Sequence, residues 1–335
     1  MGPEVPGSDS KCIGVRGEPP CCSRGRVASG PPTAPYFHEI RSPIVKIVRK
    51  SGRAKKLVAV VTPVARFPLS ADEEISMLHL RKHLGTFDRY IIGPPDLPKE
   101  FSDFTLKPFP AKFFTDRYGY NHLMLTENFY RAFAEYEYIL IYQLDCLVFA
   151  GNLEEWCRKN WDYIGAPWLK NPQQPSDGFR AVGNGGLSLR RVSSALTVLT
   201  SKNLVDDPQT LGQKPGERSK VVYDFLKSVP LLNRIFTATK ALLHSFGYHN
   251  NMSWRIKQTL EYKSHEDFFW ALDAPKVMKD FRIPPPHEAL AFSIEMAPSY
   301  CLAENSGKLP FGCHAWAKYD REFWEPFLLP TQPHP

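Results

Sequence analysis

Short apolar runs alternate with segments of helical character along the first half of the chain. "KKLVAVVTPVAR" is rich in β-branched residues, and "LSADEEISMLHLRKHLG" follows it with a capping box of Ser70 and Glu73 and a closing Gly85. "DRYIIGPP" is a second short apolar run that stops at Gly-Pro. Near-continuous apolar strands are typical of parallel sheets that are buried on both faces. The alternation therefore predicts an α/β fold with a mostly parallel central sheet flanked by helices.

The same alternation continues through the middle of the chain. "NHLMLTENFYRAFAEY" predicts a helix and "YILIYQLDCLVF" the strand after it, and "NLEEWCRKNW" and "DYIGAPW" predict another helix and strand. Ligands of open parallel sheets bind outside the carboxyl ends of the strands. Asp145, near the end of one such run, therefore has two interpretations. It caps a turn, or the strand holds its carboxylate at the ligand-binding edge.

Composition divides the chain into a core region and three atypical segments. A length of 335 residues with 43% hydrophobic and 13% aromatic content indicates a globular protein. Residues 1–35 are rich in Gly, Pro and Ser, which predicts a disordered N-terminal segment. We expect one catalytic domain over residues 36–328 and a Pro-rich tail over 329–335. A polar stretch followed by two short helices predicts a helical insertion at about 196–260, suited to a lid or acceptor flap.

Charge and cysteine content bear on the partners and the compartment. The net charge of +7 is concentrated in residues 1–60, which carry eleven Lys/Arg and four Asp/Glu. A basic arm of this kind touches nucleic acid or an anionic membrane, or is simply solvated, and we favour the solvated arm. No window approaches the roughly 20 apolar residues of a membrane span, and we see no secretory signal peptide. Seven cysteines without a repeated C-x-x-C frame complete the expectation of a cytoplasmic protein with no nucleic-acid partner and no transmembrane segment.

Two stretches in the middle of the chain carry candidate ligand-binding residues. The first is Gln143-Leu144-Asp145, whose carboxylate either binds a divalent cation or caps a turn. The second is "AVGNGGLSLRR", in which Gly185 and Gly186 let the backbone approach a ligand and Asn184 tolerates a left-handed conformation. The glycine spacing matches neither a dinucleotide fingerprint nor a P-loop, so this stretch is a binding loop or only a tight one.

Two stretches in the last third carry candidate catalytic and phosphate-binding residues. In "SHEDFFWALDAP", Glu266 and Asp267 precede an aromatic helix, where acids suit the helix dipole or serve as a general base. In "NSGKLPFGCHAWAKYD", His314 lies in an expected loop with Lys308 close by. A lone histidine is commonly structural, whereas a His and a Lys on one loop can serve a metal and a phosphate.

Taken together and in this order, the stretches resemble the GT-A glycosyltransferases, with a D-x-D motif, a Gly-rich loop, an acid pair and a C-terminal His loop. More closely, residues from about 55 to 328 resemble the "domain of unknown function 5672" family of glycosyltransferase-like proteins. The blocks that carry the resemblance are "GYNHLMLTENFY", "YEYILIYQLDCLVF", "WDYIGAPW", "VGNGGLSLRR", "HEDFFW" and "LPFGCHAW".

The resemblance implies a GT-A-like fold and a role for each motif at the donor site. Asp145 would be the last acid of D-x-D and would bind a divalent cation, Mn²⁺ or Mg²⁺, together with His314. Gln143 stands where the first acid is expected, so the resemblance predicts weak or dispensable metal binding. Gly185 and Gly186 would form the floor of the sugar pocket.

The resemblance also implies the remaining roles. Asp267 would be the base of an inverting reaction, with Glu266 orienting it. Lys308 would offset the charge of the leaving group, and Thr62 and Pro63 would hold the nucleotide base. Flat surfaces for sugar rings, or else core packing, are expected for the aromatic residues Tyr118, Tyr120, Trp168 and Trp270.

The predicted function is transfer of a sugar from a nucleotide-sugar donor, expected to be a UDP-sugar, to a glycan or small hydroxyl acceptor. The alternative is a non-catalytic carbohydrate- or nucleotide-binding module on the same fold. A nucleotidyltransferase is disfavoured because no Gly- and Lys-rich triphosphate loop follows the first strand. The sequence leaves open the donor sugar, the acceptor, retention or inversion, and the oligomeric state.

Overall fold

The structure is a computed structural model, which describes residues 54–95, 101–201, 228–232, 234–235, 238–239 and 265–330. All of them belong to the unit Gly52–Pro335. The expected N-terminal segment, most of the expected insertion and the end of the Pro-rich tail lie outside the described residues.

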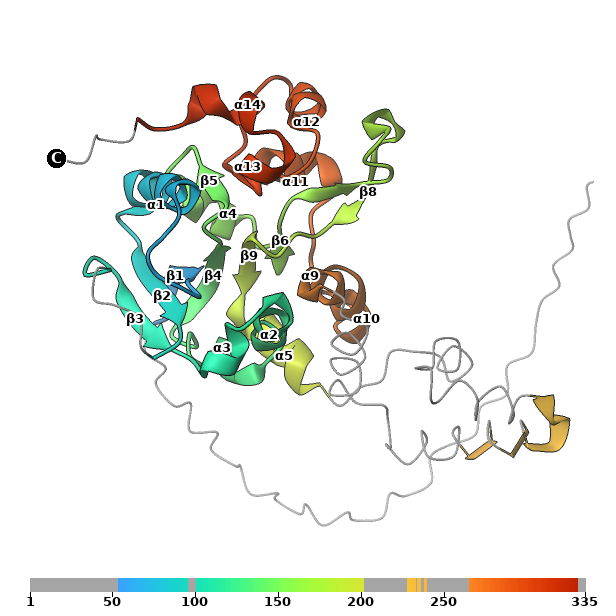
Figure 1. Ribbon diagram of the computed structural model, residues 1–335. Helices are drawn as coiled ribbons and strands as arrows, with labels where there is room; N and C mark the ends of the chain where they lie inside the picture. Colours follow the sequence, from blue (N-terminus) through green and yellow to red (C-terminus); the bar gives the residue numbers. More distant parts are fainter. Residues whose placement is uncertain are drawn as a thin grey trace, which may run out of the picture. The chain divides into compact units, whose positions relative to one another are not determined.

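A six-stranded sheet forms the centre of the described fold (Figure 1). Its strand order is β3-β2-β1-β4-β9-β6. The four strands β1 to β4 are parallel, whereas β9 runs antiparallel to both of its neighbours. This confirms the predicted α/β class and the mostly parallel sheet. The strands span Lys56–Pro63 (β1), Asp88–Gly93 (β2), Thr105–Pro108 (β3), Tyr136–Tyr142 (β4), Tyr163–Ile164 (β6) and Leu187–Arg191 (β9).

Helices cover both faces of the sheet, because successive strand side chains point to opposite faces. In β1, Val58 and Val60 belong to one buried cluster, whereas Ala59 and Val61 belong to another. The first cluster includes residues of α1 and α4, and the second includes residues of α2, α3 and α5. These helices span Ala71–Leu84 (α1), Arg117–Leu123 (α2), Glu127–Arg131 (α3), Leu153–Arg158 (α4) and Val192–Thr200 (α5).

Two small sheets and a set of short helices complete the described chain. One sheet has the order β10-β11-β5, and the other is the antiparallel pair β7 and β8. Their strands are Cys146–Val148 (β5), Pro167–Leu169 (β7), Phe179–Val182 (β8), Ser293–Ile294 (β10) and Gly312–His314 (β11). The helices are Glu266–Phe268 (α9), Ala274–Val277 (α10), Pro286–Phe292 (α11), Pro298–Glu304 (α12), Trp316–Tyr319 (α13) and Arg321–Trp324 (α14), with a π-helical turn at Phe269–Asp273 and 3₁₀ turns at Ala111–Phe113, Pro175–Asp177 and Glu325–Phe327.

Several local predictions are confirmed and two need correction. The capping box of Ser70 and Glu73 begins α1 as predicted, with both of its hydrogen bonds present. The single helix predicted from "NHLMLTENFYRAFAEY" is wrong, because Thr126 accepts a hydrogen bond from the Phe129 backbone N–H and starts α3 as a separate helix. "YILIYQLDCLVF" is likewise two strands, β4 and β5, which a turn directs into different sheets.

Two further observations concern the start of the expected insertion and the search for membrane-spanning helices. Residues 196–200 belong to α5, whose Val198 is buried against the sheet. None of the helices among the described residues is long and apolar enough to cross a membrane.

Candidate active site

A cavity of about 310 Å³ lies beyond the carboxyl end of β4. Seven residues that the sequence singled out in four separate blocks line it, namely Gln143, Asn184, Gly185, Gly186, Glu266, Asp267 and His314. The fold therefore brings together blocks that are far apart in the chain, at the edge where open α/β sheets bind ligands.

The turn after β4 determines where the Asp145 side chain lies. The Gln143 N–H donates to the Gly186 carbonyl at 2.9 Å, and the Cys146 N–H donates back to the Gln143 carbonyl at 3.0 Å. This tight turn leaves the Asp145 side chain 51% exposed, with its Oδ1 atom 3.4 Å from His314 Nε2. Asp145 is therefore a turn residue whose carboxylate faces the cavity's histidine.

His314 lies between two carboxylates. It is the last residue of β11 rather than a loop residue, and it pairs with Cys146 of β5, which places it beside Asp145. On its other side, Nδ1 is 3.1 Å from Glu295 Oε1. Burial disfavours the charged imidazole, but Asp145 and Glu295 more than offset this cost and raise the pKa of His314 to about 10.

The same residues fit a divalent cation. Ligand atoms of Asp145, Cys146 and His314 lie within 4.8 Å of one another. Burial raises the pKa of the Cys146 thiol well above its ordinary value, so the thiol is a poor ligand. A carboxylate and an imidazole remain, and the imidazole would hold Mn²⁺ or Mg²⁺ only after losing the proton that Asp145 and Glu295 favour on it.

Glu266 is fixed by a buried ion pair with Arg190. The two side chains are each 2% exposed, and they meet through a 2.7 Å and a 3.0 Å hydrogen bond. The same guanidinium also donates to the Tyr130 hydroxyl at 3.1 Å. Because both carboxylate oxygens of Glu266 are engaged, its position at the cavity wall is rigid.

Asp267 is held by two backbone donors. Its Oδ2 atom accepts from the Asn184 N–H at 3.1 Å, and its Oδ1 atom accepts from the Phe268 N–H at 2.9 Å. Burial, together with the charges of Glu266 and Glu295, raises the pKa of Asp267 to about 7. A carboxylate with a pKa near neutrality is suited to general base catalysis.

The glycines of "GNGG" are required by the chain's own side chains. A Cβ atom on Gly185 would lie 2.2 Å from Glu266 Oε1, and one on Gly186 would lie 2.1 Å from His314 Nε2. Asn184, just before these two glycines, adopts a left-handed conformation with φ of 70°, which asparagine tolerates. The loop is therefore built to let Glu266 and His314 reach the cavity.

Substitution of Gly186 with alanine should displace His314 and destabilise the fold. Overpacking at a tight site costs about 1–3 kcal/mol of unfolding free energy, and displacement of His314 would also disturb its contacts with Asn184 and Glu295. Urea denaturation of the wild type and the variant measures this cost. An unchanged midpoint would show that the imidazole moves aside without penalty.

Four predicted donor-site residues do not line the cavity, Asp145 among them. Thr62 is buried at the end of β1, and Pro63 follows it. Lys308 is exposed after α12. The roles predicted for these residues in donor binding remain predictions, without support from the cavity.

Sequence reasoning missed several residues that do line the cavity. Lys318 of α13 lies in the same quoted stretch as Lys308, and its Nζ donates to the Tyr319 hydroxyl at 3.0 Å. Glu295 follows the short strand β10 as Asp145 follows β4, and that pattern was the available signal. Arg117 of α2 also lines the cavity.

The aromatic residues separate into two groups. Trp168 and Tyr120 line the cavity. Trp270 is 1% exposed and packs in the core, so stacking a sugar on it is excluded by its burial.

Comparisons with known proteins bear on the family and the fold. The sequence model of the family described as "Protein of unknown function (DUF5672)" matches residues 103–314, which is more than half of the chain. The chain belongs to the DUF5672 family. This confirms the resemblance stated from the quoted blocks. No curated protein matches this DUF5672 chain.

Solved structures similar to this DUF5672 protein include three glycosyltransferases. The apo form of the glycosyltransferase GlyE from Streptococcus pneumoniae matches with 12% identity and a TM-score of 0.35, over 78% of this chain and 54% of GlyE. This chain thus spans about half the length of GlyE. Mouse xyloside xylosyltransferase 1 matches with 11% identity and a TM-score of 0.38, over 78% of this chain and 97% of that one.

The mannosyltransferase Ktr4p from S. cerevisiae, in complex with GDP, matches with 9% identity and a TM-score of 0.28, over 42% of this chain and 58% of Ktr4p. Because these TM-scores are low, the function proposed below rests on the residues of the cavity.

Proposed function

We propose that this DUF5672 protein is a glycosyltransferase that moves a sugar from a nucleotide-sugar donor to a hydroxyl acceptor, with inversion at the anomeric carbon. One observation carries the proposal. A single cavity is lined by Asp267, a carboxylate with a pKa of about 7, and by His314, whose Nε2 atom lies 3.4 Å from Asp145 Oδ1. Glycosyl transfer needs both a base for the acceptor and positive charge for the leaving diphosphate.

Asp267 is the proposed base. The acceptor hydroxyl gives its proton to Asp267 as its oxygen attacks the anomeric carbon and the nucleoside diphosphate leaves. The Asn184 and Phe268 N–H groups keep the carboxylate aimed while it accepts the proton. Glu266, clamped by Arg190, fixes the start of α9 and hence the position of Asp267.

The basic residues of the cavity wall are suited to the diphosphate. His314 and Lys318 supply positive charge there, and Arg117 lines the same cavity. A divalent cation would be held by Asp145 and His314 and would neutralise phosphate charge. Glu295 would then orient the imidazole through its Nδ1–H, as carboxylates behind metal-bound histidines do. With Gln143 in place of an acid, we expect this cation to bind weakly.

Thermal unfolding with a panel of UDP-, GDP- and CDP-sugars, with and without Mn²⁺, tests the proposal. A ligand at 100 times its Kd adds about 2.7 kcal/mol of stability, so one nucleotide class, expected to be UDP, should raise the Tm by several degrees. Slow hydrolysis of the same donor should accompany binding. The matched variant Asp145→Asn should lose the Mn²⁺-dependent part of the shift.

The alternative of a non-catalytic binding module has one observation in its favour, the neutral Gln143 in the cavity. Stabilisation by a nucleotide-sugar without any hydrolysis, unchanged in Asp267→Asn, would favour that alternative. A Tm unmoved by every nucleotide-sugar in the panel would refute both.

A further inference from the structure

Two aromatic rings form a stacked pair in the cavity wall. The centroids of Trp168 and Phe268 are 4.6 Å apart and the ring planes are inclined by 29°. Both side chains are partly exposed and both line the cavity. The catalytic roles proposed above use neither ring, so the pair is available to a ligand.

The backbone fixes the position of the pair. Trp168 lies on β7 and contacts Gly183, where a Cβ atom would lie 1.9 Å from the indole Cζ2 atom. Phe268 ends α9 and directly follows Asp267 in the chain. The two rings are therefore held beside the proposed base by the same loop and helix that hold the base itself.

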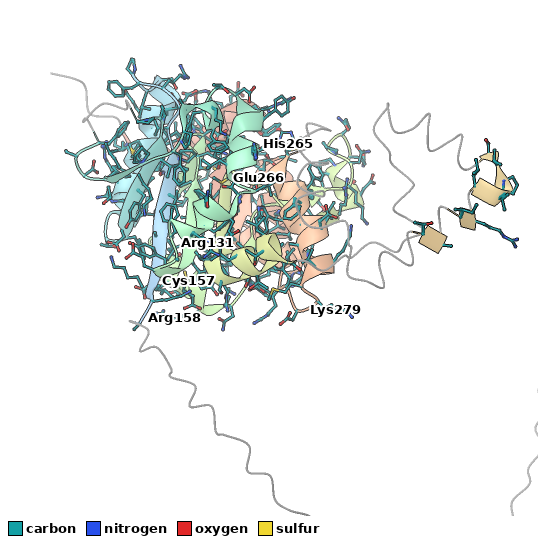
Figure 2. The ribbon with its side chains drawn as sticks, turned by 90° about the horizontal axis from the view of Figure 1, so that it is seen from below. Arg131, Cys157, Arg158, His265, Glu266 and Lys279 are labelled. Carbon is teal, nitrogen blue, oxygen red and sulfur yellow. The ribbon has the colours of Figure 1, made fainter. Side chains whose placement is uncertain are left out.

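Polar groups surround the pair at its exposed edge. The guanidinium carbon of Arg180 lies 5.9 Å from the centroid of each ring. The ring of His265 lies 6.5 Å from that of Phe268, and Figure 2 shows His265 next to Glu266. Both Arg180 and His265 are exposed. An apolar platform with hydrogen-bond donors at its rim matches a molecule that has one apolar face and hydroxyls at its edge.

The loop from Gly183 to Gly186 sets the order of groups along the cavity. Gly183 contacts Trp168, the Asn184 N–H binds Asp267, and Gly186 contacts His314. Asp267 therefore lies between the aromatic pair and the diphosphate end. A base must face the acceptor on the side of the sugar away from the leaving group, so the aromatic pair lies on the acceptor side.

We propose that the Trp168–Phe268 pair is the acceptor subsite and that the acceptor is a pyranoside whose apolar C–H face packs against the exposed part of this pair. This inference rests on the proposed glycosyl transfer. The negative face of an aromatic ring attracts the polarised C–H groups of a pyranose, and the stack buries apolar area on both partners. Arg180 and His265 donate hydrogen bonds to the acceptor's hydroxyls.

Saturation-transfer NMR with methyl β-D-glucopyranoside, methyl β-D-galactopyranoside and UDP tests this subsite on the full chain. At least one glycoside should receive saturation on the C–H protons of one ring face. Loss of an aromatic contact is worth about 0.5–1.5 kcal/mol, so the Kd of that glycoside should rise about 2- to 10-fold in Trp168→Ala and in Phe268→Leu. Phe268→Leu serves if Trp168→Ala fails to fold.

A second arginine that lies over a tryptophan ring, Arg282, supplies the control for Arg180. Arg282 lies over the Trp161 ring at 4.9 Å, as Arg180 lies over Trp168 at 5.9 Å, but Trp168 lines the cavity and Trp161 does not. Arg180→Gln should weaken glycoside binding about 2- to 10-fold, the range given by loss of one hydrogen bond, and Arg282→Gln should leave it unchanged.

The outcomes separate this inference from the proposed function. Glycoside binding that is equal in the wild type, Trp168→Ala and Phe268→Leu would overturn the subsite, and so would the absence of glycoside binding while UDP binds. If these variants lost UDP saturation but kept glycoside saturation, the pair would instead bind the nucleotide base, and the acceptor subsite would be overturned. Glycoside binding through the pair without any UDP binding would support the sugar subsite and refute the nucleotide-sugar donor.

Discussion

Replacement of Arg190 with methionine is expected to lower the free energy of unfolding by about 3–5 kcal/mol. The variant leaves the Glu266 carboxylate, 2% exposed, without its bidentate partner. A buried charge without compensation is far more costly than a missing surface contact. Urea denaturation monitored by circular dichroism measures the loss.

Two further variants separate the buried charge from the lost packing. The double variant Arg190→Met/Glu266→Leu removes both charges, so it should recover much of the stability lost in the single variant. Arg158→Met breaks an exposed pair with Glu154, where the side chains are 66% and 51% exposed, and should cost about 1 kcal/mol or less. Figure 2 shows Arg158 well away from Glu266. A cost for Arg190→Met no larger than that of Arg158→Met would refute the structural role of the pair.

Local sequence signals were sufficient for most of the central sheet. The strands β1, β2 and β4 are apolar runs, and the capping box of Ser70 and Glu73 marks the start of α1, so each is specified by residues close in sequence. The predicted long helix failed for an equally local reason. Thr126 ends one helix and caps the next, which apolar spacing alone does not reveal.

The membership of the site was predictable in part, but its contacts were not. Four quoted blocks contain eleven of the residues that line the cavity, and the sequence singled out seven of these. Their geometry depends on pairings between distant segments, such as β5 with β11, which places His314 beside Asp145. Arg190 reads as a surface residue of a strand end, and only the folded chain shows it buried against Glu266. Lys308 was selected over Lys318 because separation along the chain does not reveal which lysine faces the cavity.

Substitution of Asp267 with asparagine should reduce the rate of sugar transfer by about 10²- to 10⁴-fold, the usual contribution of a general base. In the wild type the rate should rise with pH and level off above the pKa of Asp267, about 7, because only the ionised carboxylate accepts a proton. The residual rate of the variant should not rise with pH in this range. Asp177→Asn, at an exposed position outside the cavity, is the matched control and should keep both the rate and the pH profile.

The same carboxylate should affect stability in the opposite direction. Folding raises the pKa of Asp267 from 3.8 to about 7. Between about pH 4 and pH 7, the folded chain therefore keeps a proton on Asp267 that the unfolded chain has lost. Stability therefore falls as pH rises from about 4 to 7, and the full cost, on the order of 4 kcal/mol, persists above that range.

Asp267→Asn removes the ionisation and should flatten this part of the stability profile. Above pH 7 the variant should be more stable than the wild type, although its amide cannot accept from both the Asn184 and Phe268 N–H groups, which offsets part of the gain. A variant that is slower but more stable above pH 7 is the signature of a buried base whose charge is maintained for chemistry. A variant that is less stable than the wild type at every pH would instead assign Asp267 to the support of the loop.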